Sequence, residues 1–465
     1  MAQTDHANPH TARIARFVSG LRYEAIPSEV IARIKLLILD SLGCALYAPE
    51  LPWSRILVER LAAVDTSGTH SVWGTRQRLG APHAALANGT LVQGFELDDV
   101  HRKGVLHVGA VTLPAVLAVL EGRDGVTGRD LLTAAVAGYE IGPRVGLCMG
   151  PEHIGQGWHS GATVGVFSAA AGAARALGLD AERTVHALGI GGTQSAGLMA
   201  AQYGAMVKRM HAGRAAQSGF YGALLAQAGF TGIVNVFESE YGGFCSTFSR
   251  STDRYDLTRL SAGLGEQFET MGIALKFYAC VGSNHTTLDA IRAMQARHPF
   301  GADDVRRITV HGSRVTVDHV GWPYTPQGLT SAQLNLPYCV ATLLLEGDAF
   351  VAQFREDMVA DPRRMALSTR VHCVEDPAIT AEGAAMRHKV RVEVELTDGT
   401  RMEETVLAAR GSERSFASAD DVVAKFHKLA AASLDDAQAA ELRDRILDLE
   451  RQADAGRVMA LLAPA

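Results

Sequence analysis

Long runs of small, uncharged residues constrain the fold of this chain more than any other feature of its sequence. Leu188–Ala201 contains no charged residue, and Gly161–Leu179 contains only Arg175. The chain has 47 glycines, and glycine leaves no side chain between neighbouring backbones. We therefore expect helices that pack closely through small residues. A chain of 465 residues is long enough for two or three domains.

Apolar residues recur at helical spacing through the first 230 residues. Ile31, Ile34, Ile38 and Leu42 repeat every three or four positions, as one face of a helix requires. Helical patterns occupy residues 11–63, 81–93, 111–120, 130–149, 161–177, 181–192 and 219–228. A short extended segment is expected near Val72.

The pattern changes near Glu266. Arg306–Val317 alternates between polar and apolar residues and predicts a strand, and Val390–Val406 predicts a hairpin. Helices are expected at residues 286–297, 331–345 and 419–462. The predicted fold is mainly α, with an all-helical large domain built from both chain ends (residues 1–265 and 411–465) and an inserted α+β lid domain (residues 266–410). The cleft between such domains suits a small-molecule site.

Charge and cysteine usage exclude several classes of protein. The formal net charge is −6 and the pI is near 6.3, so we expect no nucleic-acid partner. None of the six cysteines forms a CxxC pair, which is typical of free thiols in a reducing compartment. The sequence shows neither a signal-peptide pattern nor a membrane-spanning run, so we expect a cytoplasmic protein without a membrane partner.

Positive charge is concentrated in Tyr203–Gly219, just after the uncharged run. Lys208, Arg209, His211 and Arg214 fall within seven positions. The segment indicates either a pocket for an anion, such as a carboxylate, or a basic surface loop. If the segment is helical, Lys208 and His211 share a face and Arg209 points elsewhere. The lysine charge would then lower the pKa of the histidine.

Two other segments place histidines beside acidic or small residues. Glu96, Asp98 and Asp99 precede His107, a pattern that fits an acid–base histidine oriented by carboxylates, a metal site or a solvated helix start. His159 lies between glycines before a predicted helix. There it is either part of an anion site or a helix cap without chemistry.

Lys276, Tyr278 and Tyr324 lie at the start of the predicted lid domain and in a turn-rich loop within it. Each is a candidate for the cleft, and the alternatives are a surface lysine, a core tyrosine and an ordinary turn.

The sequence has no GxGxxG after a strand, no GxxxxGK[ST], no GxSxG and no HExxH. We therefore expect no cofactor and no metal, and proton transfer next to a carboxylate by acidic, histidine, lysine and tyrosine side chains.

Five segments together resemble the MmgE/PrpD family: LDSLGCALYA from Leu39, ANGTLVQGFELDDVH with LHVGAVTLPAVLAV, GWHSGATVG, GAMVKRMHAGRAAQSG and ALKFYACVGSNHTTLDA. They follow the family's order and spacing from about residue 11 to 450. The family includes 2-methylcitrate dehydratase, cis-aconitate decarboxylase and iminodisuccinate epimerase. The resemblance implies an all-helical domain with a smaller α+β lid domain, a homodimer and no metal.

The resemblance also implies roles for single residues. Its catalytic positions match His107, His159, Lys208 and, more loosely, Tyr324. Lys276 matches the lysine that opens the lid domain. The substrate-binding candidates are Glu96, Asp99, Arg209, His211, Arg214, Lys276 and Tyr278.

Two departures from the family pattern argue against a direct assignment to cis-aconitate decarboxylase. Glu96 stands where the family often has aspartate. The stretch from Asp99 to His107 is also one residue longer than in the decarboxylase.

These observations lead us to expect a cofactor-independent lyase that acts on a small di- or tricarboxylic acid. Elimination of water, as in a dehydratase, is the leading expectation. Epimerisation or isomerisation shares the first proton transfer, and decarboxylation shares the carboxylate site and the protonation step. The alternative of a different class is a non-catalytic carboxylate-binding protein.

Overall fold

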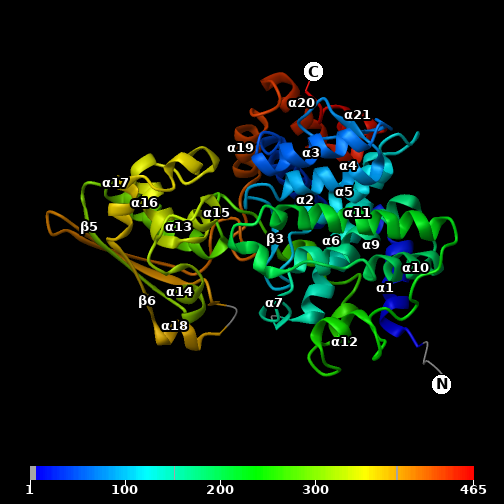
Figure 1. Ribbon diagram of the computed structural model, residues 1–465, viewed down its shortest axis with the longest axis horizontal. Helices are drawn as coiled ribbons and strands as arrows, with labels where there is room; N and C mark the ends of the chain where they lie inside the picture. Colours follow the sequence, from blue (N-terminus) through cyan, green and yellow to red (C-terminus); the bar gives the residue numbers. More distant parts are fainter. Residues whose placement is uncertain (1–6, 151, 384–385, 465) are drawn as a thin grey trace.

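The computed structural model describes residues 7–150, 152–383 and 386–464. A larger helical body lies beside a smaller body that contains a sheet (Figure 1). The prediction of a mainly α fold is confirmed. Within the described ranges, no helix is both long and apolar enough to cross a membrane.

Most helices of the larger body come from the first part of the chain: α1 (Pro9–Gly20), η1 (Tyr23–Ala25), α2 (Ser28–Tyr47), α3 (Pro52–Val64), α4 (Ala81–Val92), α5 (Val108–Leu120), α6 (Gly128–Met149), α7 (Glu152–Gly155), α8 (Ser160–Thr163), α9 (Gly165–Leu177), α10 (Ala181–Gly192), η2 (Met199–Tyr203), α11 (Val207–Gln227), α12 (Phe244–Ser249), η3 (Leu257–Leu260) and η4 (Glu269–Gly272). Two small antiparallel pairs accompany them: β1 (His70–Ser71) with β2 (Arg78–Leu79), and β3 (Val100–His101) with β4 (Ile273–Ala274).

Small residues let the central helices approach closely. Every residue of α5 is buried, and α5 packs against α4, α6, α9 and α11. Where α4 crosses α11, a Cβ built on Gly89 would lie 2.6 Å from the Cα of Gly213. A Cβ built on Gly213 would lie 2.0 Å from the carbonyl oxygen of Leu86. These distances confirm the predicted small-residue packing and fix α11 against the end of α4.

The end of the chain returns to the larger body as α19 (Ala419–Ala430), α20 (Asp436–Leu447), η9 (Leu449–Arg451) and α21 (Gly456–Ala460). Helix α19 packs on α2, where Lys425 Nζ lies 2.6 Å from Asp40 Oδ1. Both side chains are buried. Apolar residues of this tail, such as Phe426 and Leu442, belong to the same hydrophobic core as the first helices.

The smaller body combines helices and a sheet: η5 (Gly282–Asn284), α13 (His285–Arg297), β5 (Val305–Gly312), α14 (Arg314–Val320), α15 (Leu329–Leu334), α16 (Leu336–Glu346), η6 (Val351–Gln353), η7 (Glu356–Met358), α17 (Pro362–Ser368), β6 (Val371–Glu375), α18 (Pro377–Ala381), β7 (Val390–Leu396) and β8 (Arg401–Val406). The strand order is β6-β5-β7-β8, with only β5 and β6 parallel. The predicted hairpin is confirmed as β7–β8, which turns at Gly399 with a φ of 89°.

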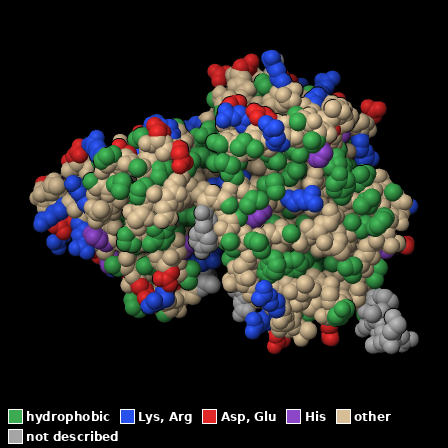
Figure 2. All heavy atoms as spheres, in the orientation of Figure 1, with side chains coloured by type: hydrophobic (Ala, Val, Ile, Leu, Met, Phe, Trp, Pro, Cys, Tyr) green, Lys and Arg blue, Asp and Glu red, His purple; other side chains and the backbone are tan. Residues whose placement is uncertain are grey.

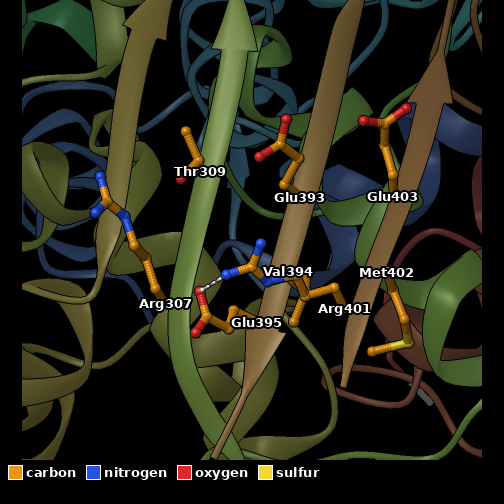
Figure 3. Close-up of a pocket in the computed structure, with 8 residues that line it drawn as sticks. All are labelled: Arg307, Thr309, Glu393, Val394, Glu395, Arg401, Met402 and Glu403. Carbon is orange, nitrogen blue, oxygen red and sulfur yellow. Dashed lines mark ion pairs between the residues drawn. The ribbon is translucent and has the colours of Figure 1, made fainter. Parts of the chain in front are cut away.

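The two faces of this sheet differ in character. Val390, Val392 and Val394 of β7 are buried in a second hydrophobic core, which α13 covers. On the other face, a shallow hollow of about 520 Å³ is lined by side chains of both charges, including Arg401 and Glu395, 3.5 Å apart (Figure 3). The strict alternation of β7 therefore reflects a sheet with one buried and one polar face.

Several predicted elements have different bounds in the structure. The strand expected over Arg306–Val317 ends at Gly312, because the Ser313 side chain accepts a hydrogen bond from Thr316 N and starts α14. The helix expected at 331–345 is two helices, since Asn335 caps α16. The basic segment and the helix expected after it form one continuous helix, α11.

Two hydrophobic cores divide the chain near the predicted boundaries. The first core extends to Phe277 and resumes at Ala417, and the second consists mainly of residues from Tyr278 to Leu396. Cys44, Phe95, Leu97 and Leu429 of the larger body join the second core where the two bodies meet. We infer two domains from these cores. The boundaries at residues 265 and 411, and the role of the smaller body as a lid, stay predictions.

Replacement of Gly213 by Ala should lower the free energy of unfolding by about 1–3 kcal/mol or more, because the new methyl group would overlap the backbone of α4. Gly20→Ala is the matched control, since nothing lies within 4 Å of a Cβ at this position, and it should change stability by less than about 1 kcal/mol. Urea unfolding of both variants measures the difference. Equal stability of the two variants would show that the close crossing of α4 and α11 is not required.

Candidate active site

Glu96 is the centre of a buried cluster of charged side chains. Its Oε1 accepts hydrogen bonds from Lys208 Nζ and, at 2.6 Å, from Arg209 Nη1. Its Oε2 lies 3.4 Å from Lys276 Nζ. The exposed fractions of these four side chains range from 3% to 11%. One carboxylate is thus shared by three cations from two distant parts of the chain.

The turn that carries Glu96 is held in an unusual conformation. Glu96 has a φ of 58°, which is uncommon for a residue with a side chain. Lys276 Nζ donates to the carbonyl oxygen of Glu96 at 3.1 Å, and Lys425 Nζ donates to that of Leu97 at 2.8 Å. Gln333 Nε2 donates to the carbonyl of Phe95 at 3.3 Å. Strain at such a position persists when the surroundings hold it in place, and it is frequent at functional sites.

Two structural features bring the cations to Glu96. The pairing of Val100 with Ala274 in β3–β4 places Lys276 beside the turn. The first turn of α11 supplies Lys208 and Arg209. The expectation that Arg209 points elsewhere is wrong. Both long side chains reach the same carboxylate, because Glu96 lies close to the start of the helix.

The charges in this cluster do not balance. Burial alone would raise the pKa of Glu96, but Lys208, Lys276 and Arg209 outweigh burial and hold it well below its usual value. Burial lowers the pKa of Lys208, and Glu96 offsets only part of that effect. One ionised carboxylate against three cations leaves two positive charges in excess. Buried excess charge is unfavourable unless an anion joins it.

Two histidines lie next to Lys208 in a second cluster. His159 Nδ1 and His211 Nδ1 are 3.2 Å apart, so one ring donates and the other accepts. Burial lowers the pKa of His159 well below its ordinary value, and the charge of Lys208 lowers it further. Burial and Lys208 also lower the pKa of His211, as the sequence predicted for the effect of the lysine. Both rings are therefore neutral near pH 7.

A third histidine pairs with a buried carboxylate. His107 Nδ1 lies 2.9 Å from Asp98 Oδ2, and the exposed fractions of the two side chains are 15% and 0%. This contact leaves Nε2 as the ring nitrogen free for chemistry. The neighbouring Asp99 accepts from Gly109 N and from the Tyr139 hydroxyl, each at 2.8 Å, so it supports the start of α5. Burial raises the pKa of Asp99 to about 7.

The structure places the other candidates away from the Glu96 cluster. Arg214 is exposed and donates to Gln217. The hydroxyl of Tyr278 donates to Asp289 at 2.7 Å, and that of Tyr324 donates to the carbonyl of Val359 at 2.9 Å. The ring of Tyr324 also packs on Tyr338, with ring centroids 4.6 Å apart. Both tyrosine hydroxyls are thus hydrogen-bonded within the smaller body.

The sequence interpretation missed His319, an exposed histidine of α14 in the smaller body. His319 lines a cavity of about 430 Å³ between the bodies, together with Gln202 and Gly204 just before α11. Its Nδ1 lies 3.2 Å from Ser283 Oγ. Although the residue is exposed, loss of water contacts to the surrounding protein lowers its pKa, and the charges of Arg387 and Lys208 contribute. No motif surrounds His319 in the sequence, so only the packing of α14 could reveal it.

Unsatisfied polar atoms mark the same region. In the described parts of the chain, Arg209 Nη2, Asp98 Oδ1 and both amide atoms of Gln93 are buried without a hydrogen-bond partner. Such groups are rare in folded proteins and often indicate that a ligand or water completes the site. Among the described residues, no group of three or more His, Cys, Asp and Glu side chains could hold a metal ion.

Comparison with known proteins identifies the family. Residues 12–255 match the MmgE/PrpD N-terminal domain, and residues 278–451 match the MmgE/PrpD C-terminal domain. The chain belongs to the MmgE/PrpD family. The resemblance noted in the sequence is therefore confirmed. Glu96, Lys208 and Arg209 lie in the matched N-terminal domain, and Lys276 lies just before the matched C-terminal domain.

Named relatives within the MmgE/PrpD family are lyases. A cis-aconitate decarboxylase-like protein of Aspergillus oryzae is 35% identical over 97% of each chain. A cis-aconitate decarboxylase of Aspergillus terreus is 34% identical over 97% of this chain and 95% of its own. The 2-methylcitrate dehydratase of Escherichia coli K12 is 24% identical over 80% of this chain and 79% of its own. The MmgE/PrpD chain described here is accordingly an enzyme of the lyase type.

Replacement of Glu96 by Gln should lower the free energy of unfolding by about 3–5 kcal/mol, because three buried cations would lose their anionic partner. Urea unfolding measures the loss. Glu441→Gln is the control, since its exposed pair with Arg445 should contribute less than about 1 kcal/mol. A loss in the Glu96 variant no larger than in the control would contradict the central role of this carboxylate.

The histidine pair should make stability depend on pH. The pKa of each buried histidine is lower in the folded state than in the unfolded chain, where it is about 6.5. Their contribution is complete above this value and is lost as the pH falls through it, because the unfolded state binds more protons. As the pH falls, the free energy of unfolding of the wild type should decrease more steeply than that of the variant His159→Gln/His211→Gln. The additional decrease should reach up to about 1.4 kcal/mol per histidine and pH unit.

Urea unfolding between about pH 7.5 and pH 5.5 tests this dependence. The difference between wild type and double variant removes the contributions of the other titrating groups. A constant difference across the range would mean that the two histidines are not held neutral.

Proposed function

We propose that this enzyme decarboxylates a tricarboxylic acid, with cis-aconitate as the substrate. The observation that carries the proposal is the excess of two positive charges around Glu96 in a buried site. A polyanion can neutralise this excess, whereas a neutral substrate cannot. The substrate is taken from the Aspergillus relatives, whose similarity covers nearly the whole chain.

Lys208, Arg209 and Lys276 would bind substrate carboxylates. Arg209 Nη2 has no partner among the described residues and can donate to a carboxylate oxygen. The lysine ammonium groups each have several donors and can contact Glu96 and a second anion together. In this arrangement, Glu96 holds the three cations in place before the substrate arrives.

The chemistry requires one carbon–carbon bond to break and one carbon–hydrogen bond to form. In cis-aconitate, one carboxylate is attached to a CH₂ group next to the double bond. When CO₂ leaves, its bonding electron pair stays on this carbon and spreads over the allylic system. Protonation at the far end gives CO₂ and 2-methylidenebutanedioate, with no oxidant or reductant. The enzyme must bind the carboxylates and deliver one proton to a defined carbon.

Histidines are the proposed proton carriers. His107, oriented through Nδ1 by Asp98, would use Nε2 to deliver the proton. His159 and His211, neutral and in contact, would hydrogen-bond the substrate without adding charge. His319 faces the cavity from the smaller body, where the sequence placed Tyr324, and is the better candidate because the Tyr324 hydroxyl is already bound to Val359.

Dehydration stays the second candidate function. It needs the same carboxylate site and one histidine as base, and the enterobacterial relative is a dehydratase. The greater identity and coverage of the decarboxylases favour loss of CO₂ over the elimination of water that the sequence first suggested.

A homodimer is also part of the proposal. Exposed apolar side chains gather near the start of α11, including Leu198, Met206 and Val207, and near its end at Leu224, Leu225 and Phe230. Figure 2 shows hydrophobic side chains spread over the larger body, in the region of α4, α10 and α11. Exposed apolar patches of this kind are typical of surfaces that associate.

Incubation with cis-aconitate in D₂O tests the function. We expect CO₂ release and a product with a =CH₂ proton signal and one deuterium on the other methylene carbon. Alkene formation from 2-methylcitrate without CO₂ would support dehydration, and no turnover of either acid would overturn the proposal. Lys208→Met should reduce turnover by at least about 100-fold, because the buried anion site loses a charge-assisted contact.

Variants in the smaller body distinguish its two candidate catalytic residues, His319 and Tyr324. His319→Gln should lower turnover, and Tyr324→Phe, in the loop after α14, is its matched control. Tyr324→Phe should keep turnover close to wild type. A loss of turnover in Tyr324→Phe but not in His319→Gln would assign the catalytic role to Tyr324.

A further inference from the structure

Gln93 is a fully buried amide that the proposed function does not yet use. It follows the last residue of α4, three positions before Glu96, and its side chain is 0% exposed. Its backbone N–H is bonded to Gly89, but neither Oε1 nor Nε2 has a hydrogen-bond partner in the described ranges. An amide buried in this way loses its contacts with water and gains nothing from the protein in return.

The Gln93 amide lies beside the histidine pair. A Cβ built on Gly161 would lie 3.0 Å from His159 Cε1 and 4.0 Å from Gln93 Nε2. The ring and the amide therefore flank the same small residue. The absence of a side chain at Gly161 lets the ring and the amide lie on either side of this residue.

Two other buried amides show that Gln93 is exceptional. In Asn88, on the same helix, Oδ1 accepts from Trp73 N and Nδ2 donates to the carbonyl of Ser71, both at 2.9 Å. In Gln333, Nε2 donates to the carbonyls of Ala279 and Phe95, although Oε1 has no partner among the described residues. These amides hold loops together, whereas the described chain offers Gln93 no such contact.

We propose that Gln93 is a substrate-binding residue whose Nε2 donates a hydrogen bond to a carboxylate of the tricarboxylate bound at the Glu96 cluster. The proposal rests on the proposed function for the class of ligand. An amide suits this position because it donates to an anion without adding a further charge. The excess positive charge of Lys208, Arg209 and Lys276 therefore still balances the negative charge of the substrate. Gln93 would orient one carboxylate relative to His159.

The variant Gln93→Leu tests the proposal, because stability and binding should change in opposite directions. Removal of an unsatisfied buried amide should leave the thermal unfolding temperature of the ligand-free enzyme unchanged or raise it. Loss of a hydrogen bond to a charged group should weaken binding of tricarballylate, a saturated tricarboxylate, by about 10- to 100-fold in calorimetry. With cis-aconitate, we expect KM to rise more than kcat falls.

Asn88→Ala is the matched control. This amide is fully bonded within the protein, so its loss should lower the unfolding temperature and leave tricarballylate affinity unchanged. Gln93→Asn keeps the amide one methylene shorter and should retain part of the affinity. Wild-type affinity in Gln93→Leu would overturn the proposal, and so would a destabilised ligand-free enzyme, which would indicate a purely structural amide.

The two proposals can fail separately. Tricarballylate binding does not require turnover. Weakened binding in Gln93→Leu without turnover of cis-aconitate would support the role of Gln93 and reject the reaction. Turnover of cis-aconitate with unchanged tricarballylate binding in Gln93→Leu would support the reaction and reject the role of Gln93.

Discussion

Neutralisation of one buried carboxylate is the interaction on which the rest of the site depends. Glu96 stays ionised inside the protein only because Lys208, Arg209 and Lys276 surround it. Those cations need Glu96 in turn, since like charges at this depth repel each other strongly. The contact therefore fixes the first turn of α11, the segment after β4 and the turn after α4 relative to one another.

The scaffold around this cluster comes from both ends of the chain. Helix α19 reaches back so that Lys425 binds both Asp40 on α2 and the carbonyl of Leu97. The glycine crossing lets α11, whose first turn carries Lys208, pack closely on α4. From the smaller body, Gln333 binds the same turn. The strained φ of Glu96 is thus enforced by contacts from four separate parts of the sequence.

The charges and polar groups of the site that the protein itself does not pair indicate what the site binds. The cluster has excess positive charge, a histidine pair kept neutral by burial, and an amide at Gln93 without a partner in the described structure. The excess charge and the unpartnered amide are unfavourable in the free protein and become favourable when a polyanion binds. A site of this kind uses its binding energy to place carboxylates, and it leaves the histidines to move the proton.

The sequence by itself determined the elements and the chemistry available to them. Helical spacing predicted most helices of the larger body, and alternation predicted β5 and the β7–β8 hairpin. The family motifs proposed Lys208, Lys276, His107 and His159 as site residues, and these roles stay predictions. Tertiary structure decided which side chains meet. Arg209 joins the site, and Arg214, Tyr278 and Tyr324 lie outside its charged cluster. His319 lines a cavity between the bodies and Gln93 lies beside His159, and no motif indicated either residue. The physical reason is that periodicity reports local backbone geometry and burial, whereas charge balance and unsatisfied hydrogen bonds depend on groups that only folding brings together.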